Sequence, residues 1–167
     1  MHHSPAVSPV AILGSRLLHW ADEEACAAFA AQLAAALTAH GAEPDVFIEL
    51  HGPLGAGKTT FVRHLLRALG VAGRVKSPTY TVMEAYTLPG GGTASHFDFY
   101  RFTDPREWAD AGFREVFAAP GLKLAEWPEH AAAVLPVADL QLHIDTAADD
   151  SRTLRLEAGT PRGLQLL

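Results

Sequence analysis

The sequence has little of what an exported protein or a direct nucleic-acid binder usually carries. Its 167 residues include one cysteine, Cys26, so no disulfide can form within the chain, which argues for a reducing compartment. Thirteen basic residues stand against nineteen acidic ones, and the net charge of −6 disfavours binding nucleic acid through many phosphate contacts. Residues 1–9 lack the cationic start and apolar run of a signal peptide, and we expect them to form a loose N-terminus.

Long hydrophobic runs are also missing, with one stretch that needs explanation. Residues 25–42 carry no formal charge and approach the length of a membrane span. Most of them are alanine, however, and the larger apolar residues recur at helical spacing, as one stripe: Cys26, Phe29, Leu33 and Leu37. The pattern predicts an amphipathic helix that begins near the acids of residues 22–24 and ends at Gly41. We therefore expect no membrane contact and a cytoplasmic location.

A glycine-rich loop joins a predicted buried strand at 46–50 to a helix whose apolar residues recur from Phe61 to Leu69. Residues 52–59 read GPLGAGKT and satisfy the pattern G-x-x-x-x-G-K-[ST] in full. Glycines let successive backbone N–H groups point at a polyphosphate, and the following helix directs its N-terminus to the same place. Lys58 would place a positive charge on the β- and γ-phosphates, and the Thr59 hydroxyl can bind Mg²⁺.

The rest of the chain predicts strands on both sides of this unit. Residues 79–86 and 96–100 predict a hairpin around three glycines, and 122–126 predict a further strand. A helix is expected from Pro105 to about Val116, and a short one from Pro128 toward Leu135. The alternating residues within 137–167 predict a C-terminal hairpin. Together these elements predict one α/β domain over 1–167, a three-layer P-loop NTPase fold with a mixed parallel and antiparallel central sheet.

Two acidic residues could hold the metal that a phosphate loop requires. Asp98 follows the strand-like His96-Phe97, and Glu126 ends the apolar strand 122–126. Spacing does not decide between the two acids. For His96 we expect a structural role.

Two further segments could reach a nucleotide. Hydroxyls of Ser77 and Thr79 could sense a γ-phosphate as part of a switch segment, although an ordinary turn explains them equally well. The indole of Trp127 could stack on a base, although core packing explains a tryptophan at least as well.

With these motifs in place, the chain resembles the bacterial TsaE (YjeE) ATPases from about Asp22 to Ile144. The resemblance rests on four segments in the expected order: the phosphate loop GPLGAGKTT at 52–60, VKSPTYT at 75–81, HFDFYR at 96–101 and EWP at 126–128. One position departs from it. Pro53 stands where the family usually has aspartate, and proline removes one potential phosphate donor, but the position is variable and we expect function to survive.

The resemblance implies a role in forming the threonylcarbamoyladenosine modification at position 37 of tRNAs that read codons beginning with adenine. It implies a weak, Mg²⁺-dependent ATPase that acts with the TsaD and TsaB proteins and meets tRNA only through that complex. The implied catalytic residues are Lys58, Asp98 and Glu126, and the implied Mg²⁺ ligands are Thr59, Asp98 and Glu126. The implied ATP-binding residues are Gly52, Leu54, Gly55, Ala56, Gly57, Lys58, Thr59, Thr60, Thr79 and Trp127.

Two other functions use the same loop. A small-molecule or nucleoside kinase usually needs an arginine-bearing lid, which Arg101, Arg106 and Arg114 could supply, although no compact arginine-rich segment stands out. A GTPase switch is less consistent with the sequence, because it has no Asn-Lys-x-Asp motif and no Asp-x-x-Gly after the loop.

Overall fold

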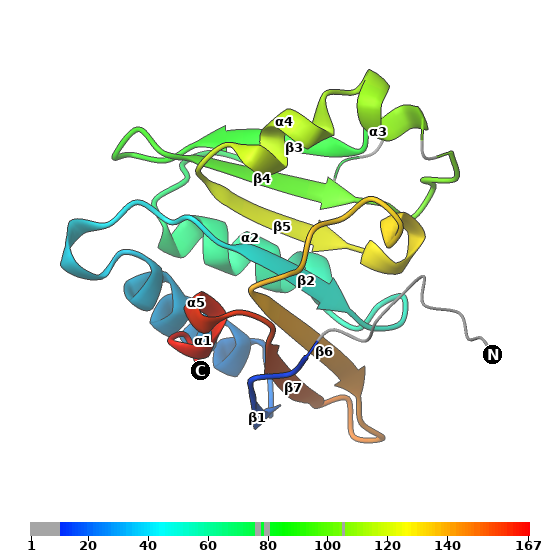
Figure 1. The fold of residues 1–167 in the computed structure, drawn as a ribbon. Coiled ribbons are helices and arrows are strands. Elements are labelled where there is room, and N and C mark those ends of the chain that lie inside the picture. Colours follow the sequence, from blue (N-terminus) through cyan, green and yellow to red (C-terminus); the bar gives the residue numbers. More distant parts are fainter. Residues whose placement is uncertain (1–10, 76–77, 79–80, 105) are drawn as a thin grey trace.

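The computed structural model describes residues 11–75, 78, 81–104 and 106–167. In this part of the chain one mixed sheet forms the centre of the molecule, with strand order β1-β7-β6-β2-β5-β4-β3 (Figure 1). Strands β6, β2, β5 and β4 run parallel, and β3, β7 and β1 pair antiparallel to their neighbours. The strands are β1 (Gly14–Trp20), β2 (Phe47–His51), β3 (Met83–Thr87), β4 (Thr93–Asp98), β5 (Leu122–Glu126), β6 (Leu140–Thr146) and β7 (Arg152–Ala158).

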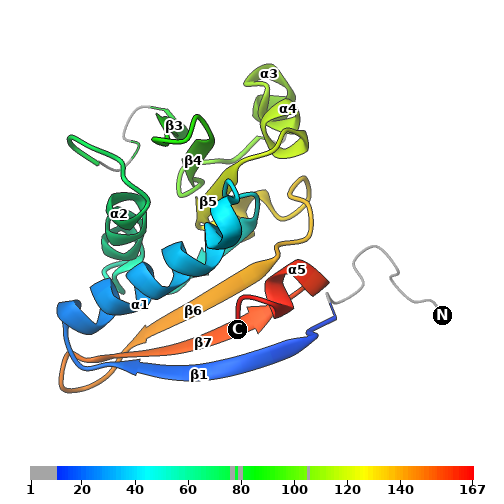
Figure 2. The ribbon, with the colours of Figure 1, turned by 90° about the vertical axis from the view of Figure 1, so that its left-hand side faces the viewer.

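Helices cover both faces of the sheet, as Figure 2 shows. The two longest helices, α1 and α2, lie together on one face, and the short α3 and α4 lie on the other. The helices are α1 (Glu23–Leu37), α2 (Lys58–Ala68), α3 (Arg106–Asp110), α4 (Phe113–Ala118) and α5 (Pro161–Leu164), with 3₁₀ turns η1 (Ala39–Gly41) and η2 (Pro128–Ala131). The predicted fold class is confirmed: the chain has an α/β fold of three layers with a mixed central sheet.

The predicted amphipathic helix is α1. The Asp22 carboxylate caps it by accepting the Ala25 N–H at 2.9 Å, and the apolar stripe of Phe29, Leu33 and Leu37 is buried. That stripe packs with α2 against the inner side of the sheet. No helix in the part of the chain that the structure describes combines the length and the apolar character needed to cross a bilayer.

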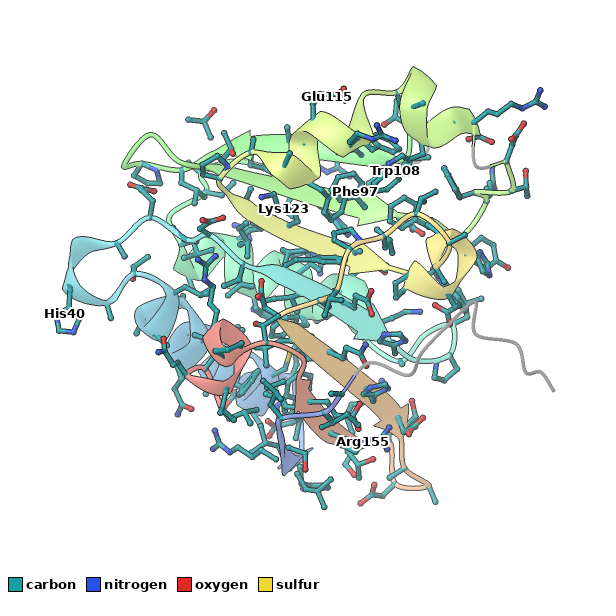
Figure 3. The ribbon with its side chains drawn as sticks, viewed as in Figure 1. His40, Phe97, Trp108, Glu115, Lys123 and Arg155 are labelled. Carbon is teal, nitrogen blue, oxygen red and sulfur yellow. The ribbon has the colours of Figure 1, made fainter. Side chains whose placement is uncertain are left out.

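A second, aromatic core fills the space under α3 and α4. Figure 3 labels Phe97 of β4 and Trp108 of α3 in this layer, and both rings meet Phe113 edge to face, at 5.3 and 5.7 Å between centroids. This layer covers the β3-β4-β5-β2 half of the sheet and anchors β4 and β5, the two strands that end in predicted acids.

Two predicted helices differ from those observed. The expected helix from Pro105 to Val116 is wrong as a single element, because α3 ends at Asp110 and Gly112 takes a left-handed φ of 74° before α4 begins. The helix expected from Pro128 toward Leu135 is only the one-turn η2. Strand β3 begins at Met83, and residues 79 and 80 of the predicted strand lie outside the described residues.

Candidate functional site

The glycine-rich loop lies between the carboxyl end of β2 and the N-terminus of α2. Gly52 is required because a Cβ there would lie 2.5 Å from the backbone oxygen of Ile144 in β6. Gly57 caps α2 with a φ of 107°, which side-chain-bearing residues rarely adopt. The loop opens on a cavity of about 640 Å³, a size typical of ligand sites. Seven of the predicted binding residues line this cavity: Leu54, Gly55, Gly57, Lys58, Thr59, Thr60 and Trp127.

Lys58 is the only cation of the loop itself and is 5% exposed. Its Nζ donates to the Gly52 carbonyl oxygen at 2.6 Å, which folds the loop back on itself. Burial lowers the pKa of Lys58, and the nearby carboxylates of Glu126, Glu129 and Asp98 oppose that shift by favouring the charged form. The loop therefore holds its cation beside acids, as a site for a phosphate–metal complex would.

Glu126 is bound by two side chains from different elements. The Thr59 hydroxyl lies 2.9 Å from both carboxylate oxygens and donates to them, and His96 Nε2 lies 2.6 Å from Oε2. Glu126 is 3% exposed and His96 is fully buried, so these hydrogen bonds fix the carboxylate in one orientation. This contact fits the structural role expected for His96. It also identifies Glu126 as the residue that His96 holds, which the sequence did not indicate.

Asp98 ends β4 directly beside Glu126 at the end of β5, because the two residues are partners in the parallel register. Burial raises the pKa of Asp98, while the N–H of Tyr100, donating to Oδ1 at 3.0 Å, acts in the opposite direction. Both acids line the cavity. The sequence left the choice between them open; the structure places both at the site but hydrogen-bonds only Glu126 to Thr59.

These oxygen donors fit Mg²⁺ better than a metal that needs a complete protein cage. No group of three or more histidine, cysteine, aspartate or glutamate side chains in the described part of the chain is placed to enclose a metal. Mg²⁺ retains several waters and is usually held by one or two carboxylates together with substrate phosphates. A hydroxyl and two carboxylates beside a phosphate loop are such a partial donor set.

Trp127 lies over the loop lysine. Lys58 Nζ is 3.6 Å from the centroid of the Trp127 ring, a cation–π contact. The Trp127 backbone has a left-handed φ of 54°, and its ring packs beside Tyr100 and His130 at 5.1 and 5.6 Å between centroids. The indole thus lies at the Lys58 side of the cavity.

The predicted switch segment is described only in part. Thr79 and Ser77 lie outside the described residues, whereas Pro78, Thr81 and Val82 line the cavity. Gly52 and Ala56 of the predicted set do not line it. Gly52 acts through its carbonyl on Lys58.

Three further residues lie at the loop or line its cavity. Tyr100 and Arg101 line the cavity; the sequence had marked Tyr100 only as part of the motif at 96–101, and Arg101 only through that motif and as a possible residue of a kinase lid. Arg152, at the start of β7, donates from Nε to the Ala56 carbonyl oxygen at 2.8 Å. No local pattern could have found Arg152, because the fold brings it to the loop from 96 residues away.

The arginines do not form a kinase-like lid in the described part of the chain. Arg101 lines the cavity, whereas Arg106 is exposed and paired with Asp104, and Arg114 does not reach the cavity. The arginine that contacts the loop, Arg152, binds its backbone.

Comparison with known proteins gives the same family throughout. Residues 20–154 match the family model of the threonylcarbamoyl adenosine biosynthesis protein TsaE. The tRNA threonylcarbamoyladenosine biosynthesis protein TsaE of Haemophilus influenzae is 39% identical over 146 residues, covering 87% of this chain and 91% of that protein. The protein of the same name from Bacillus subtilis is 40% identical, covering 74% and 77%.

A solved structure supports the assignment through the fold. The crystal structure of YdiB from Bacillus subtilis superimposes with a TM-score of 0.73 at 31% identity, covering 92% of this chain and 91% of that one. The phosphate loop, the paired strand-end acids and the tryptophan over Lys58 all fall within the matched residues. The chain belongs to the TsaE family.

Proposed function

We propose that this protein is a weak, Mg²⁺-dependent ATPase required for the threonylcarbamoyladenosine modification at position 37 of tRNAs that read codons beginning with adenine. The observation that carries the proposal is the hydrogen bonding of Thr59, in the phosphate loop, to Glu126, at the end of the neighbouring strand. This contact joins the two oxygen donors that a Mg²⁺–triphosphate complex needs, within one cavity and beside Lys58.

The proposed chemistry consists mainly of positioning and charge neutralisation. The backbone N–H groups of the loop and the N-terminus of α2 would bind the β- and γ-phosphates, and Lys58 would supply the positive charge. Its hydrogen bond to Gly52 and its contact with Trp127 keep the ammonium group at the mouth of the loop. Leu54, Gly55, Ala56, Gly57 and Thr60 would complete the phosphate cradle, and Thr79 remains a predicted contact to the nucleotide.

Thr59, Glu126 and Asp98 would hold Mg²⁺, which supplies charge stabilisation at the transferring phosphoryl group. His96 would position Glu126 from the buried side of the site, because its ring is fully buried and its Nε2 contacts the carboxylate. Burial raises the pKa of Asp98, and a bound Mg²⁺ would oppose that shift by favouring the charged carboxylate.

We further propose that the chain acts as one domain over residues 1–167 in the cytoplasm, with TsaD and TsaB as partners. The family's pathway modifies tRNA, and the net charge of −6 fits a subunit that reaches tRNA through its partners rather than by its own charge.

Two measurements test the proposal. Inorganic phosphate release from ATP should require Mg²⁺ and should vanish in Lys58→Ala, with the far-ultraviolet circular dichroism spectrum unchanged. The protein should also co-purify with TsaB and TsaD in an ATP-dependent manner. Phosphate release retained in Lys58→Ala would contradict the ATPase assignment, and failure to associate in every nucleotide state would leave a P-loop protein of other function.

A further inference from the structure

In the described part of the chain, strand β1 forms an edge of the sheet and pairs only with β7; Figure 2 shows it outermost. All seven of its residues pair with β7 in one continuous register, so the strand has no bulge, and it contains no proline. About half of the backbone N–H and C=O groups of such a strand face away from its neighbour. The outer side of β1 is therefore a row of groups with which another strand can pair.

Large apolar side chains are exposed along this edge. Leu17, in the middle of β1, is 77% exposed, and Ile12 and Leu13, directly before the strand, are 57% and 46% exposed. Leu164 of α5 is also exposed and lies over the start of β1, because a Cβ on Gly14 would be 2.7 Å from its Cδ1. Four of the seven large hydrophobic residues that are exposed in the described part of the chain are these. Apolar residues gathered in this way are typical of an interaction surface, whereas single scattered ones are not.

The opposite edge of the sheet differs in charge and in apolar exposure. Strand β3 has five residues, one of them the acid Glu84, and it contains none of the exposed large hydrophobic residues. Charged residues on an edge strand discourage pairing with another chain. Residues 11–20 contain none of the chain's nineteen acidic residues, and Arg16 is their only residue with a formal charge. The β1 edge is thus the less protected of the two.

Charge and symmetry favour a second copy of this chain as the partner. Two chains of net charge −6 repel each other least where they meet at a surface without acids, and the β1 edge is such a surface. Leu17 is the central residue of the strand. When two copies of β1 pair antiparallel about it, Leu17 of one copy lies opposite Leu17 of the other. In the same register Arg16 lies opposite Leu18 rather than opposite another arginine, so no like charges face each other directly.

We propose that two copies of this protein associate through β1 and form one continuous sheet across a twofold axis at Leu17. The backbone groups of the two edges pair with each other, and the apolar side chains beside them become buried. Strand β1 contributes no residue to the lining of the larger cavity, so the contact does not use the phosphate-loop site.

Analytical ultracentrifugation of the full chain tests the association. The mean mass should rise from that of one chain toward that of two as the concentration increases from about 5 to about 500 µM. Leu17→Lys places a charge at the centre of the contact in both copies and should raise the dimer Kd at least about tenfold. The matched control is Val137→Lys, because Val137 is 53% exposed and precedes β6, two strands away from the edge. This control should dimerise like the native chain.

A cross-link tests the register. Directly opposite residues of antiparallel strands have Cα atoms about 4.5–5.5 Å apart, which is within the range of a disulfide. Leu17→Cys should therefore form a covalent dimer when oxidised with copper phenanthroline. The native Cys26 should not react, because it is buried and burial raises the pKa of its thiol to about 12. Ser15→Cys is the control on the same strand, because in this register Ser15 lies opposite His19 and the two copies of residue 15 are far apart.

A native chain that remains monomeric at every concentration would overturn the proposal. A dimer that Leu17→Lys leaves as tight as the native one would also overturn it, because the contact would then use another surface. Equal cross-linking of Leu17→Cys and Ser15→Cys would contradict pairing about Leu17. Dimerisation that begins only after residues 1–10 are removed would assign the edge to the chain's own N-terminal segment instead of a second copy.

Discussion

One lysine is buried at each end of the parallel strands, and the surroundings of the two lysines differ. Lys58, at the carboxyl ends, and Lys123, near the amino end of β5, are both 5% exposed, and burial lowers the pKa of both. Lys58 faces a cavity of about 640 Å³ beside two strand-end carboxylates. Lys123 donates to the backbone oxygen of Ala119, with Asp45 3.9 Å away.

The amino end is a closed network of polar groups. Asp45 accepts the N–H of Gly121 at 3.1 Å and pairs with Arg162. Asp139 accepts the N–H of Phe47 at 2.7 Å and the hydroxyl of Thr160 at 2.6 Å. Each of these carboxylates ties two chain segments together, so this end stabilises the fold, whereas the carboxyl end leaves its charges facing space that a ligand can enter.

The sharpest test of this contrast replaces each lysine with methionine, which keeps much of the side-chain volume. Lys58→Met should reduce ATP hydrolysis by at least about a hundredfold, since the charge at the β- and γ-phosphates is lost. Lys123→Met should keep native hydrolysis per folded molecule, although it leaves the Ala119 oxygen without its donor and should cost about 1–2 kcal/mol in the free energy of unfolding. Phosphate release and urea unfolding measure the two effects, and comparable activity losses would erase the distinction between the two ends.

The next test removes one carboxylate from the open end. Glu126→Gln should lower Mg²⁺-dependent hydrolysis by about a hundredfold, because the neutral amide is a poor Mg²⁺ ligand and the contacts with Thr59 and His96 change character. Asp98→Ala should also lose Mg²⁺-dependent activity.

Glu129→Gln is the matched control for Glu126→Gln, because it removes a nearby exposed charge that acts on Lys58 only through space. It should hydrolyse ATP like the native protein. If the Glu126 and Asp98 variants also keep native activity across a Mg²⁺ titration, the metal assignment is wrong.

A smaller effect separates function from stability at Asp98. Because burial raises the pKa of this carboxyl above its usual 3.8, the folded state binds its proton more tightly than the unfolded state does. The contribution of Asp98 to stability is therefore fully present below pH 3.8 and is lost as the pH rises through the folded-state pKa.

Asp98→Asn should consequently be at least as stable as the native protein at pH 7 while losing activity, and its advantage should shrink toward pH 4. Urea unfolding at several pH values gives the comparison. A variant that is clearly less stable at pH 7 would show that the charged Asp98 contributes to folding, contrary to the cost inferred from burial.

The sequence predicted the phosphate loop and the two strand-end acids better than the contacts that hold them, because the signals of the loop and the acids are local. The phosphate loop is a continuous motif, and Asp98 and Glu126 follow recognisable strands, so their meeting at one edge follows from parallel pairing. The contact between His96 and Glu126 depends on how β4 lies against β5, and the approach of Arg152 depends on where the β6–β7 hairpin returns. Such contacts join distant segments, and no spacing within one segment encodes them.

The prediction of helices and strands from the sequence has the same limit. Buried strands and the amphipathic helix carry clear apolar patterns and were predicted, whereas β1 was missed. That strand lies at an edge of the sheet with most of its side chains exposed, Leu17 at 77%, so it has no alternation of buried and exposed residues to detect. The break at Gly112 was also missed, because a glycine within a helical pattern does not by itself show that the chain reverses its φ there.

The smallest expected effect concerns the contribution of the two lysines to the free energy of unfolding, and it appears only at alkaline pH. The lowered pKa of each means that, in the pH window between the folded-state pKa and 10.5, the unfolded chain binds more protons than the folded one. The free energy of unfolding should therefore gain a contribution from each lysine as the pH rises through that window. Lys58→Met and Lys123→Met should each remove part of this gain, measured as the difference from the native protein in urea unfolding between about pH 8 and pH 10.5. Equal losses would show that the two ends bury their charge at the same cost and differ only in what the charge faces, whereas a loss confined to Lys58→Met would show that Asp45 and the Ala119 carbonyl fully compensate the burial of Lys123.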